Sequence, residues 1–414
     1  MKALRFHPTL ARAVSAKLGS VFTKAAFWGP HSPLSYGEVP VPELPSPGWV
    51  LVRTRLAGIC GSDLAAITLK GSLDSPLQRF VSFPMFLGHE IVGQVERCGA
   101  DAGGLREGER VAVYPILSCA PRGISPPCPF CAAGDFNLCL NLAAGALPPG
   151  QVIGVNSRTG GGFSELFVAH RSQLFPVPES VGDEQAVLLD PLCVALHAAL
   201  QARVVAGMRV LVLGAGIVGL AVVRMLRLLC PGCRIFVVAR HPFQKELALA
   251  CGADRILAET EDPQAGEALA AELGATQHRA RTVRPFFMGG FEAVLDCVGT
   301  ARTLQRSIAW SNHRGRVVLV GASPPARFEW SLLYWKELEL VGSMSFGTET
   351  VDGVRRHAFD VVLGWLLDGR LRTDPFPVRT FRLAEYRDAL RSLMDRGAGG
   401  LVKAAFDFRG EEET

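Results

Sequence analysis

The chain has 414 residues, which is long enough for two domains with cores of their own. An apolar fraction of 49% and a charged fraction of 20% exclude an intrinsically disordered protein, and a net charge of +4 is too balanced to indicate a nucleic-acid-binding surface. The longest apolar run, VLVLGAGIVGLAVV, is too short and too rich in glycine for a transmembrane helix. We therefore expect a globular protein whose partners include neither nucleic acid nor a membrane.

The N-terminal segment predicts no secretory signal, because no compact apolar stretch follows the first basic residues. Residues 1–37 lack Asp and Glu, as transit peptides do, but MKALRF fits a first β-strand better. Eleven cysteines without a secretory signal favour a reducing compartment, so we expect a cytoplasmic protein. Residues 8–23 are expected to be a surface addition, either a solvated loop or a helix.

Up to about residue 175, short β-like runs alternate with turn residues, as in GWVLVRTRLAGIC, HEIVGQVERCG and GERVAVYP. Such punctuation is typical of a small antiparallel, barrel-like domain. The motifs GICGSD and GHE place Cys60 and His89 at the ends of expected strands. Either residue alone is more often a core residue. Together with an acid, a thiolate and an imidazole can form a three-ligand zinc site with an open fourth position.

Four cysteines lie close together in the stretch CAPRGISPPCPFCAAGDFNLC. Cys128 and Cys131 offer two thiolates from one turn, Cys139 follows, and Cys119 would supply a fourth. The alternative is a set of four small buried hydrophobic residues, which the prolines and the Asn and Asp of this loop disfavour. The sequence therefore predicts a zinc site here rather than disulfides.

From about residue 195 to 340, apolar strands alternate with helical patterns, which predicts a parallel sheet covered on both faces. The strand RVLVL is followed by GAGIVG and then by a helix. In this context Gly214 would make a tight turn, Gly216 would let the backbone approach a pyrophosphate, and Gly219 would let the helix pack on the strand. Ile217 and Val218 begin the helix whose free N–H groups would face the phosphates.

The second strand of this region, RIFVVAR, ends at Arg240 and His241 without the acid that would hold the ribose 2′-hydroxyl of NAD. A guanidinium at this place can pair with a 2′-phosphate, so NADP(H) is expected to be favoured over NAD(H). The alternative is that Arg240 only caps the sheet edge and either cofactor binds.

Two further motifs lie in this region. Cys230 and Cys233 form CPGC, which we interpret as a turn rather than a redox pair. The basic stretch TQHRARTVR, residues 276–284, is expected to be a solvated loop or helix.

The motifs GICGSD, GHEIVGQV, GERVAV, the cysteine stretch, GAGIVG and KELELVGS occur in an order that resembles the zinc-dependent medium-chain alcohol dehydrogenases. The resemblance runs from about residue 25 to residue 405. It implies an α/β fold, with a Rossmann doubly wound parallel sheet and a GroES-like antiparallel β-barrel catalytic domain. The implied domains are residues 1–180 with a structural zinc lobe at 115–142, an NAD(P)-binding domain at 181–340, and a return to the catalytic domain at 341–414. A homodimer or homotetramer is expected on the same ground.

The resemblance also implies roles for residues of the catalytic site. Cys60 and His89 match catalytic zinc ligands, and Asp190 matches the third ligand, with Cys193 as the alternative. Glu90 matches a carboxylate that can approach the metal as an alternate ligand. Ser62 matches the hydroxyl that bonds the substrate oxygen, and Asp63 matches the acid that orients the ligating histidine. The four clustered residues match the ligands of a structural zinc: Cys119, Cys128, Cys131 and Cys139.

Two departures from the family pattern stand out. Eight residues, APRGISPP, separate Cys119 from Cys128, so Cys119 is the least certain ligand of the four. Ala65 stands where many relatives have a histidine that passes the proton outward. We expect an enzyme that transfers a hydride between NAD(P)+ and a secondary alcohol, polyol or similar alcohol, or reduces the matching carbonyl. The alternatives are a non-catalytic nucleotide-binding homologue and a zinc-free enone or quinone reductase, and the substrate itself stays open.

Overall fold

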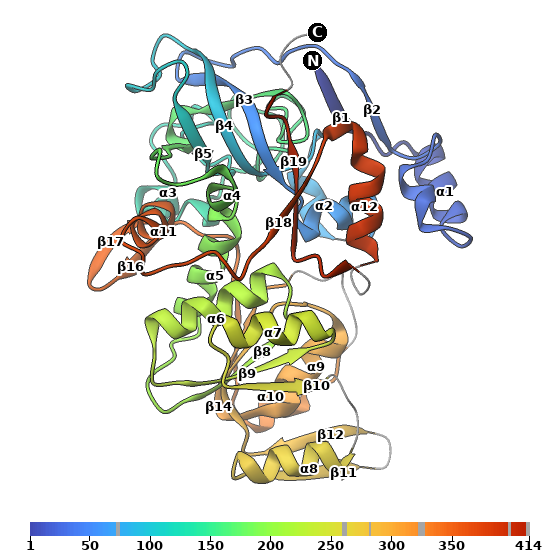
Figure 1. Cartoon of the computed structure of the whole chain (residues 1–414), viewed down its shortest axis with the longest axis vertical. Coiled ribbons are helices and arrows are strands. Elements are labelled where there is room, and N and C mark those ends of the chain that lie inside the picture. The colour runs from blue at the N-terminus through green and yellow to red at the C-terminus, as the bar shows by residue number, and fades with distance from the viewer. Residues whose placement is uncertain (72–74, 259–262, 281–282, 322–327, 396–398, 411–414) are drawn as a thin grey trace. The chain divides into compact units, whose positions relative to one another are not determined.

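The computed structural model describes residues 1–71, 75–258, 263–280, 283–321, 328–395 and 399–410 (Figure 1). Contacts divide the chain into two compact units. Unit 1 comprises Met1–Asp190, Gly347–Gly369 and Phe376–Thr414, and unit 2 comprises Pro191–Phe346 and Arg370–Pro375.

Unit 1 is built on a seven-stranded sheet in which five strands follow one another in the order β19-β3-β4-β5-β7, all antiparallel. β6 also pairs with β3, and β18 runs parallel to β19 at the edge. The predicted antiparallel GroES-like domain is therefore confirmed. The strands are β3 (Trp49–Gly58), β4 (Glu90–Cys98), β5 (Arg110–Val113), β6 (Leu166–His170), β7 (Leu174–Pro176), β18 (Val378–Phe381) and β19 (Lys403–Asp407).

Shorter elements complete unit 1. The two-stranded ladders are β1 (Lys2–Phe6) with β2 (Leu34–Glu38) and β16 (Thr348–Val351) with β17 (Val354–His357). The α-helices are α1 (Leu10–Gly19), α2 (Gly61–Ile67), α3 (Pro129–Ala132), α4 (Asp183–Ala186), α11 (Ala358–Leu367) and α12 (Tyr386–Met394), and α5 (Leu189–Gln201) begins here. The 3-10 helices are η1 (Lys24–Trp28), η2 (Pro76–Phe80), η3 (Phe136–Leu138), η4 (Arg171–Gln173) and η5 (Leu383–Glu385).

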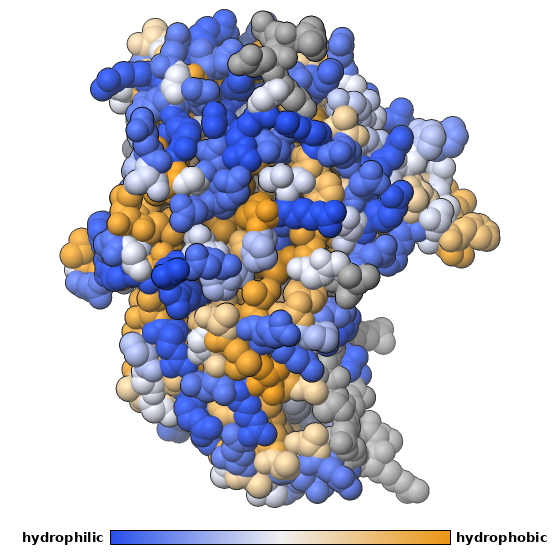
Figure 2. All heavy atoms as spheres, in the orientation of Figure 1, coloured by the Kyte–Doolittle hydropathy of each residue, from blue (hydrophilic) through white to orange (hydrophobic). Residues whose placement is uncertain are grey.

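The surface addition predicted at residues 8–23 forms α1, whose first turn is capped by the Thr9 hydroxyl accepting the Arg12 N–H at 3.4 Å. Leu10 and Leu18 on the helix and Phe22 beyond its end are 82%, 66% and 91% exposed, whereas the small residue Ala16 is the one that α1 buries. Figure 2 shows this apolar surface at the outer end of α1.

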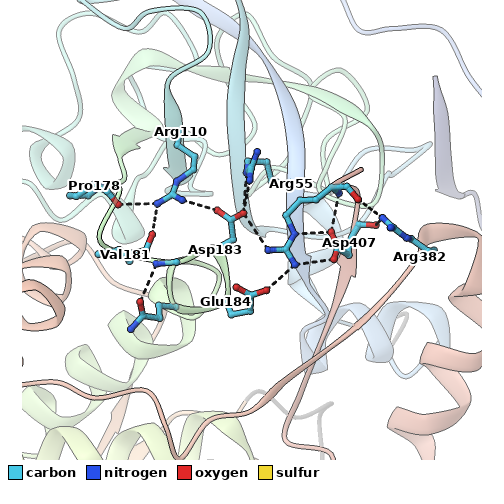
Figure 3. Close-up of polar contacts among 11 residues, drawn as sticks. Arg55, Arg110, Pro178, Val181, Asp183, Glu184, Arg382 and Asp407 are labelled. Carbon is cyan, nitrogen blue, oxygen red and sulfur yellow. Dashed lines mark hydrogen bonds and ion pairs between the residues drawn. The ribbon is translucent and has the colours of Figure 1, made fainter. Parts of the chain in front are cut away.

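A buried carboxylate ties several elements of unit 1 together (Figure 3). Asp183, at the start of α4, is 4% exposed and lies 2.9 Å from the Arg55 guanidinium and 3.4 Å from that of Arg110. Arg409 lies 3.5 Å from the same carboxylate and also pairs with Asp407 at 2.9 Å. The Asp183 carboxylate therefore connects α4 with β3 and β5, and through Arg409 with Asp407 of β19. It lies shortly before α5, the helix that carries Asp190.

Unit 2 contains six parallel strands in the order β10-β9-β8-β13-β14-β15, the order of a doubly wound nucleotide-binding sheet. The predicted Rossmann sheet is confirmed. The six strands are most apolar and most buried at the centre of the sheet, where both faces are covered. They are β8 (Arg209–Leu213), β9 (Arg234–Ala239), β10 (Arg255–Ala258), β13 (Phe291–Asp296), β14 (Ser311–Leu319) and β15 (Glu339–Gly342). The helices are α6 (Ile217–Leu229), α7 (Pro242–Ala250), α8 (Pro263–Glu272), α9 (Ala301–Trp310) and α10 (Ser331–Trp335).

Two local predictions in unit 2 had different outcomes. Cys230 and Cys233 lie in a turn between α6 and β9, with the Cys233 N–H donating to the Cys230 carbonyl at 3.2 Å, as expected. The expectation of a solvated loop or helix at residues 276–284 was wrong for its described residues, which belong to the antiparallel hairpin of β11 (Thr276–Ala280) and β12 (Val283–Met288). Phe287, in the apolar run PFFM of β12, is completely buried and holds the hairpin against the rest of unit 2. The basic residues before this run led to the wrong expectation.

Candidate active site and cofactor site

The strand register of unit 1 brings Cys60 and His89 together. β3 and β4 are antiparallel with Gly58 opposite Glu90, so the residues that follow β3 meet those that precede β4. A sulfur of Cys60, a ring nitrogen of His89 and a carboxylate oxygen of Glu90 all lie within 4.8 Å of one another. Cys60 and His89 are partly exposed, whereas Glu90 is buried.

Asp63 holds the geometry of this group. Its carboxylate is buried, and it accepts the backbone N–H of Cys60 at 2.9 Å and that of Gly88 at 3.2 Å. The same carboxylate lies 3.6 Å from Nδ1 of His89. A carboxylate beside one ring nitrogen helps to fix the orientation of the imidazole. Gly88 has a φ of +78°, and a Cβ there would overlap the ring of Phe163, so glycine is required beside the histidine.

The charges of the group favour a bound cation. Burial by itself would raise the pKa of the Cys60 thiol, but the hydrogen bond and charge of His89 outweigh it and lower this pKa to about 6. Burial by itself would lower the pKa of His89, but the Asp63 carboxylate and the Cys60 sulfur raise it well above its ordinary value. The Cys60 sulfur and the His89 ring thus share one proton between them. A divalent metal can take the place of that proton, because both groups bind a metal in their deprotonated forms.

Glu90 takes part in a buried ion pair that sequence reasoning missed. Nζ of Lys403, on β19, contacts Oε2 of Glu90, and the two side chains are only 1% and 3% exposed. Nζ also lies 3.3 Å from the Ile59 carbonyl. A Cβ at Gly58 would fall closer than van der Waals contact to both charged side chains. A single lysine within the apolar strand LVKAAF was the signal that could have revealed it.

The remaining predicted residues lie around this group. Asp190 is the second residue of α5 and is 8% exposed. Burial raises its pKa to about 7, although the nearby charge of His89 opposes the shift. Its carboxylate is not among the donor atoms within 4.8 Å of one another in the described part of the chain, whereas that of Glu90 is. Ser62 is exposed in the first turn of α2, and Ala65 is half-buried in the same helix.

The four cysteines of the loop form a second group of donors. Their sulfurs all lie within 4.8 Å of one another, and all four residues are buried: Cys119, Cys128, Cys131 and Cys139. The sulfurs of Cys119 and Cys139 are 3.7 Å apart. Burial raises the pKa of Cys139 to about 11, whereas backbone N–H donors outweigh burial and lower that of Cys128 to about 6. Such crowded thiols suit a tetrahedral, four-thiolate zinc site.

Arg122 fixes the long segment between Cys119 and Cys128, so that Cys119 still lies beside the other three cysteines. Its guanidinium is completely buried and donates to carbonyl oxygens on two sides of the loop. These include Leu117 at 2.9 Å, Ala144 at 2.9 Å and Leu147 at 3.2 Å. The inserted residues are therefore fixed by one internal cation, which the sequence pattern of cysteines alone could not indicate.

The glycine motif of unit 2 has the form expected for binding a pyrophosphate. Gly214 has a φ of +95°, and a Cβ at Gly219 would overlap the Gly214 carbonyl, so both positions require glycine. A Cβ at Gly216 would meet no atom within 4 Å. Gly216 is the N-cap of α6, whose first N–H groups have no carbonyl partner within the helix.

A polar cavity of about 390 Å³ lies at the ends of β9 and β10, lined by Ala239, Arg240, Lys245, Ala258 and Arg302. Three of these five residues are cations. His241, the other residue predicted here, caps α7 and stacks on Phe243 with ring centroids 5.8 Å apart. Such a lining can accept an anionic group of a ligand.

Comparisons with known proteins agree with this geometry. Residues 46–179 match the model of the alcohol dehydrogenase GroES-like domain, and residues 218–360 match that of the zinc-binding dehydrogenases. L-threonine 3-dehydrogenase of Anaeromyxobacter dehalogenans is 31% identical over 307 residues, covering 74% of this chain and 78% of the relative. This chain belongs to the zinc-binding medium-chain alcohol dehydrogenase family. The expected family is thereby confirmed.

Other members of the family match more of this dehydrogenase. The starvation-sensing protein RspB of Escherichia coli is 28% identical over 372 residues, covering 90% of this chain and 94% of the relative. The crystal structure of RspB with NADH has a TM-score of 0.71 at 28% identity and covers 91% of this chain and 96% of that chain. A protein of Sinorhizobium meliloti described as a zinc-binding dehydrogenase, solved with NADP, has a TM-score of 0.67 at 26% identity and covers 90% and 96%.

The dehydrogenase is thus a zinc-dependent and NAD(P)-dependent enzyme. Both donor groups of unit 1 fit zinc, because they offer thiolate, imidazole and carboxylate ligands at close range. The glycine motif of unit 2 fits the dinucleotide. No helix in the described ranges is long and apolar enough to cross a membrane.

Proposed function

We propose that this dehydrogenase oxidises secondary alcohols, including polyols or amino alcohols, with NADP+, and reduces the matching ketones. The observation that carries the proposal is the cluster of Cys60, His89 and Glu90 at the ends of β3 and β4, with Asp63 fixing the imidazole. The relatives support the substrate class, since L-threonine 3-dehydrogenase and L-galactonate-5-dehydrogenase both carry names of enzymes that act on a secondary hydroxyl.

Cys60, His89 and Asp190 would hold the catalytic zinc. Glu90 is the alternate ligand, and its pairing with Lys403 keeps its carboxylate neutralised in the described structure. Asp190 is buried near the charges of His89 and Cys60, so a cation between these groups would stabilise its ionised form. Cys119, Cys128, Cys131 and Cys139 would hold a structural zinc that takes no part in the reaction.

When bound, zinc acts as a Lewis acid that lowers the pKa of the substrate hydroxyl, and the nicotinamide accepts the hydride. Ser62, exposed in the first turn of α2, would accept the hydroxyl proton. Ala65 cannot pass that proton on, so it leaves Ser62 through water. Asp63 keeps His89 in one orientation by its contact with Nδ1.

The preference for NADP(H) rests on Arg240 together with Lys245 and Arg302. These cations line the cavity at the ends of β9 and β10, and no acid lies among its described lining residues. The 2′-phosphate of NADP would pair with these cations, whereas NAD has only a neutral hydroxyl at that position. Gly214, Gly216 and Gly219 would support the pyrophosphate at the N-terminus of α6, where Ile217 and Val218 contribute the first N–H groups.

A homodimer or homotetramer is proposed on the exposed edge of the six-stranded sheet. β15 is the last strand in the described order, and the neighbouring α10 exposes Trp330, Tyr334 and Trp335 by 66%, 81% and 69%. Large aromatic side chains at this exposure are typical of an interface between subunits. The many free thiols fit a reducing compartment, and the cytoplasm stays a prediction.

The test is nicotinamide absorbance during turnover with a panel of primary, secondary, polyol and amino alcohols and the matching carbonyls. Each substrate is offered with NAD(H) and with NADP(H). The proposal predicts turnover of secondary alcohols, lost on zinc removal, with a lower KM for NADP+ than for NAD+. Silence across the panel in zinc-loaded protein would refute the substrate class and favour a non-catalytic homologue. Equal KM values for the two cofactors would refute the NADP preference alone.

A further inference from the structure

A second cavity of unit 2, of about 580 Å³, lies outside the site described above. It is formed by β10, α8, α9, the β11–β12 hairpin and the start of α10, and α8 packs beside the hairpin (Figure 1). Its described lining includes none of the residues of the glycine motif and shares only Ala258 with the cavity of Arg240. The volume lies in the range of pockets that enclose an organic ligand.

The inner walls of this cavity are apolar and well packed. Leu257 and Leu269, from β10 and α8, are 8% and 4% exposed. Trp310, at the end of α9, stacks on Phe287 with ring centroids 5.2 Å apart and planes 8° apart. Phe287 is fully buried, so the hairpin fixes one face of the indole. These walls would accept an alkyl or aryl body.

The polar part of the lining is dominated by arginine. Arg255, Arg284 and Arg306 line the cavity, and Glu329 is the single acid among its described lining residues. The Glu329 carboxylate already accepts the Ser331 N–H at 2.7 Å, at the start of α10. The Arg306 guanidinium lies over the Trp310 ring at 5.1 Å. Arg255 already pairs with Glu272, which lies outside the lining. The lining therefore combines apolar walls with more arginine side chains than carboxylates, and a guanidinium can bind an anionic head group.

One lining residue has an acceptor without a partner. Oε1 of Gln277, on β11, is buried and has no hydrogen-bond partner among the described residues. A Cβ at Gly266 of α8 would lie 3.1 Å from this oxygen and closer still to Nε2, so glycine leaves the amide its room. A buried unpaired acceptor is costly to the folded protein and calls for an explanation. A hydroxyl or N–H group of a ligand would supply the missing donor.

We propose that this cavity binds an amphipathic organic anion: a carboxylate or phosphate monoester on an apolar body, with a hydroxyl or amide donor for Gln277. The apolar body would lie against Leu257, Leu269 and Trp310, and the head group would pair with Arg306. The proposal does not depend on the alcohol substrate or on the preference for NADP(H), because the two cavities have separate linings apart from Ala258.

The test uses the full-length, zinc-loaded protein saturated with NADP+, so that the dinucleotide site is occupied. The probe is 8-anilinonaphthalene-1-sulfonate, an aryl body with an anionic group, followed by its fluorescence. We expect one saturable site per chain, displaced by decanoate or decyl phosphate and not by decanol. The relative strength of decanoate and decyl phosphate then identifies which head group the cavity prefers.

Three variants separate this cavity from other surfaces. Arg306→Gln should weaken decanoate binding about tenfold, since it removes a charged partner. Ala265→Trp fills the cavity from an exposed position of α8 and should abolish binding while turnover persists. The proposal predicts that the wild type prefers 3-hydroxydecanoate to decanoate, and Gln277→Leu should remove that preference. Arg314→Gln, at an exposed pair with Glu337 outside the cavity, is the matched control and should change nothing.

Two results would overturn the proposal. One is the absence of saturable binding of the probe by the NADP+-saturated protein, which includes the case where NADP+ itself releases the probe. The other is binding that Ala265→Trp and Arg306→Gln leave at wild-type affinity. The thermal stability of each variant, measured alongside, shows that a loss of binding does not come from misfolding.

Discussion

Replacing Lys403 by methionine removes the buried cation beside the proposed metal site. In the wild type Nζ contacts the Glu90 carboxylate, and the two side chains are 1% and 3% exposed, so water screens the pair very little. Lys403→Met would leave the Glu90 carboxylate buried without a counter-charge. Breaking such a pair from one side costs about 3–5 kcal/mol, because the remaining ion keeps its desolvation penalty.

The measurement is denaturant unfolding of the zinc-loaded protein, monitored by the release of zinc. Because both groups of metal donors lie in unit 1, this signal reports the unfolding of unit 1. Lys403→Met should lower the free energy of unfolding by about 3–5 kcal/mol. Arg53→Met is the matched control, since Arg53 pairs with Glu96 in the same sheet but the side chains are 43% and 36% exposed. An exposed pair contributes about 0–1 kcal/mol. The double variant Glu90→Gln with Lys403→Met should recover most of the loss, because no charge is then left unpaired.

The reasoning would be refuted if Lys403→Met cost no more than Arg53→Met. It would also fail if the double variant were as unstable as the two single changes added together, because the two charges would then not compensate one another.

Four further predictions concern the metals, the cofactor and acid stability. Asp190→Asn should lose the catalytic zinc, whereas Glu90→Gln should retain it, as metal analysis would show; the reverse result would make Glu90 the third ligand. Cys131→Ser should lower the melting temperature before it alters kcat, because its zinc would be structural, and an unchanged melting temperature with lost turnover would contradict that role. Arg240→Asp should raise the KM for NADP+ about tenfold or more and that for NAD+ much less, and equal effects would remove the cofactor argument. Burial lowers the pKa of His357 to about 4, so this histidine stays neutral in the folded protein. In the unfolded chain it takes up a proton below its ordinary pKa of 6.5, so the stability of the folded protein should fall as the pH is lowered from 6.5 to 4. His357→Asn, which keeps an acceptor for the Phe359 N–H, should make that fall less steep in unfolding measured across this range, and an unchanged slope would count against the buried neutral histidine.

The parts of the site that could be predicted from the sequence are those carried by short motifs. Gly214 and Gly219 are required by backbone geometry within a few residues, so their spacing between an apolar strand and a helical pattern indicated the turn before α6. Cys60 and His89 belong to strand ends that an antiparallel pairing joins, and their residue types were sufficient to suggest a metal.

The parts that could not be predicted depend on pairing between distant segments. Lys403 is 313 residues from Glu90 and meets it only because β19 pairs with β3. Arg122 looked like an ordinary loop residue until the fold surrounded it with carbonyl groups. The strand β12 was hidden because the basic residues before it resemble a solvated loop, and its burial depends on packing against α9 and the sheet.

The measurement that tests the central claim most directly is metal content and turnover of Cys60→Ser beside the wild type. The account predicts two zinc ions per chain and NADP+-dependent turnover of a secondary alcohol in the wild type, in line with its two groups of donors. Cys60→Ser should keep the structural zinc, lose the catalytic one, and show no turnover while its affinity for NADP+ is unchanged. A Cys60→Ser protein that keeps both zinc ions and full turnover would contradict the proposed site.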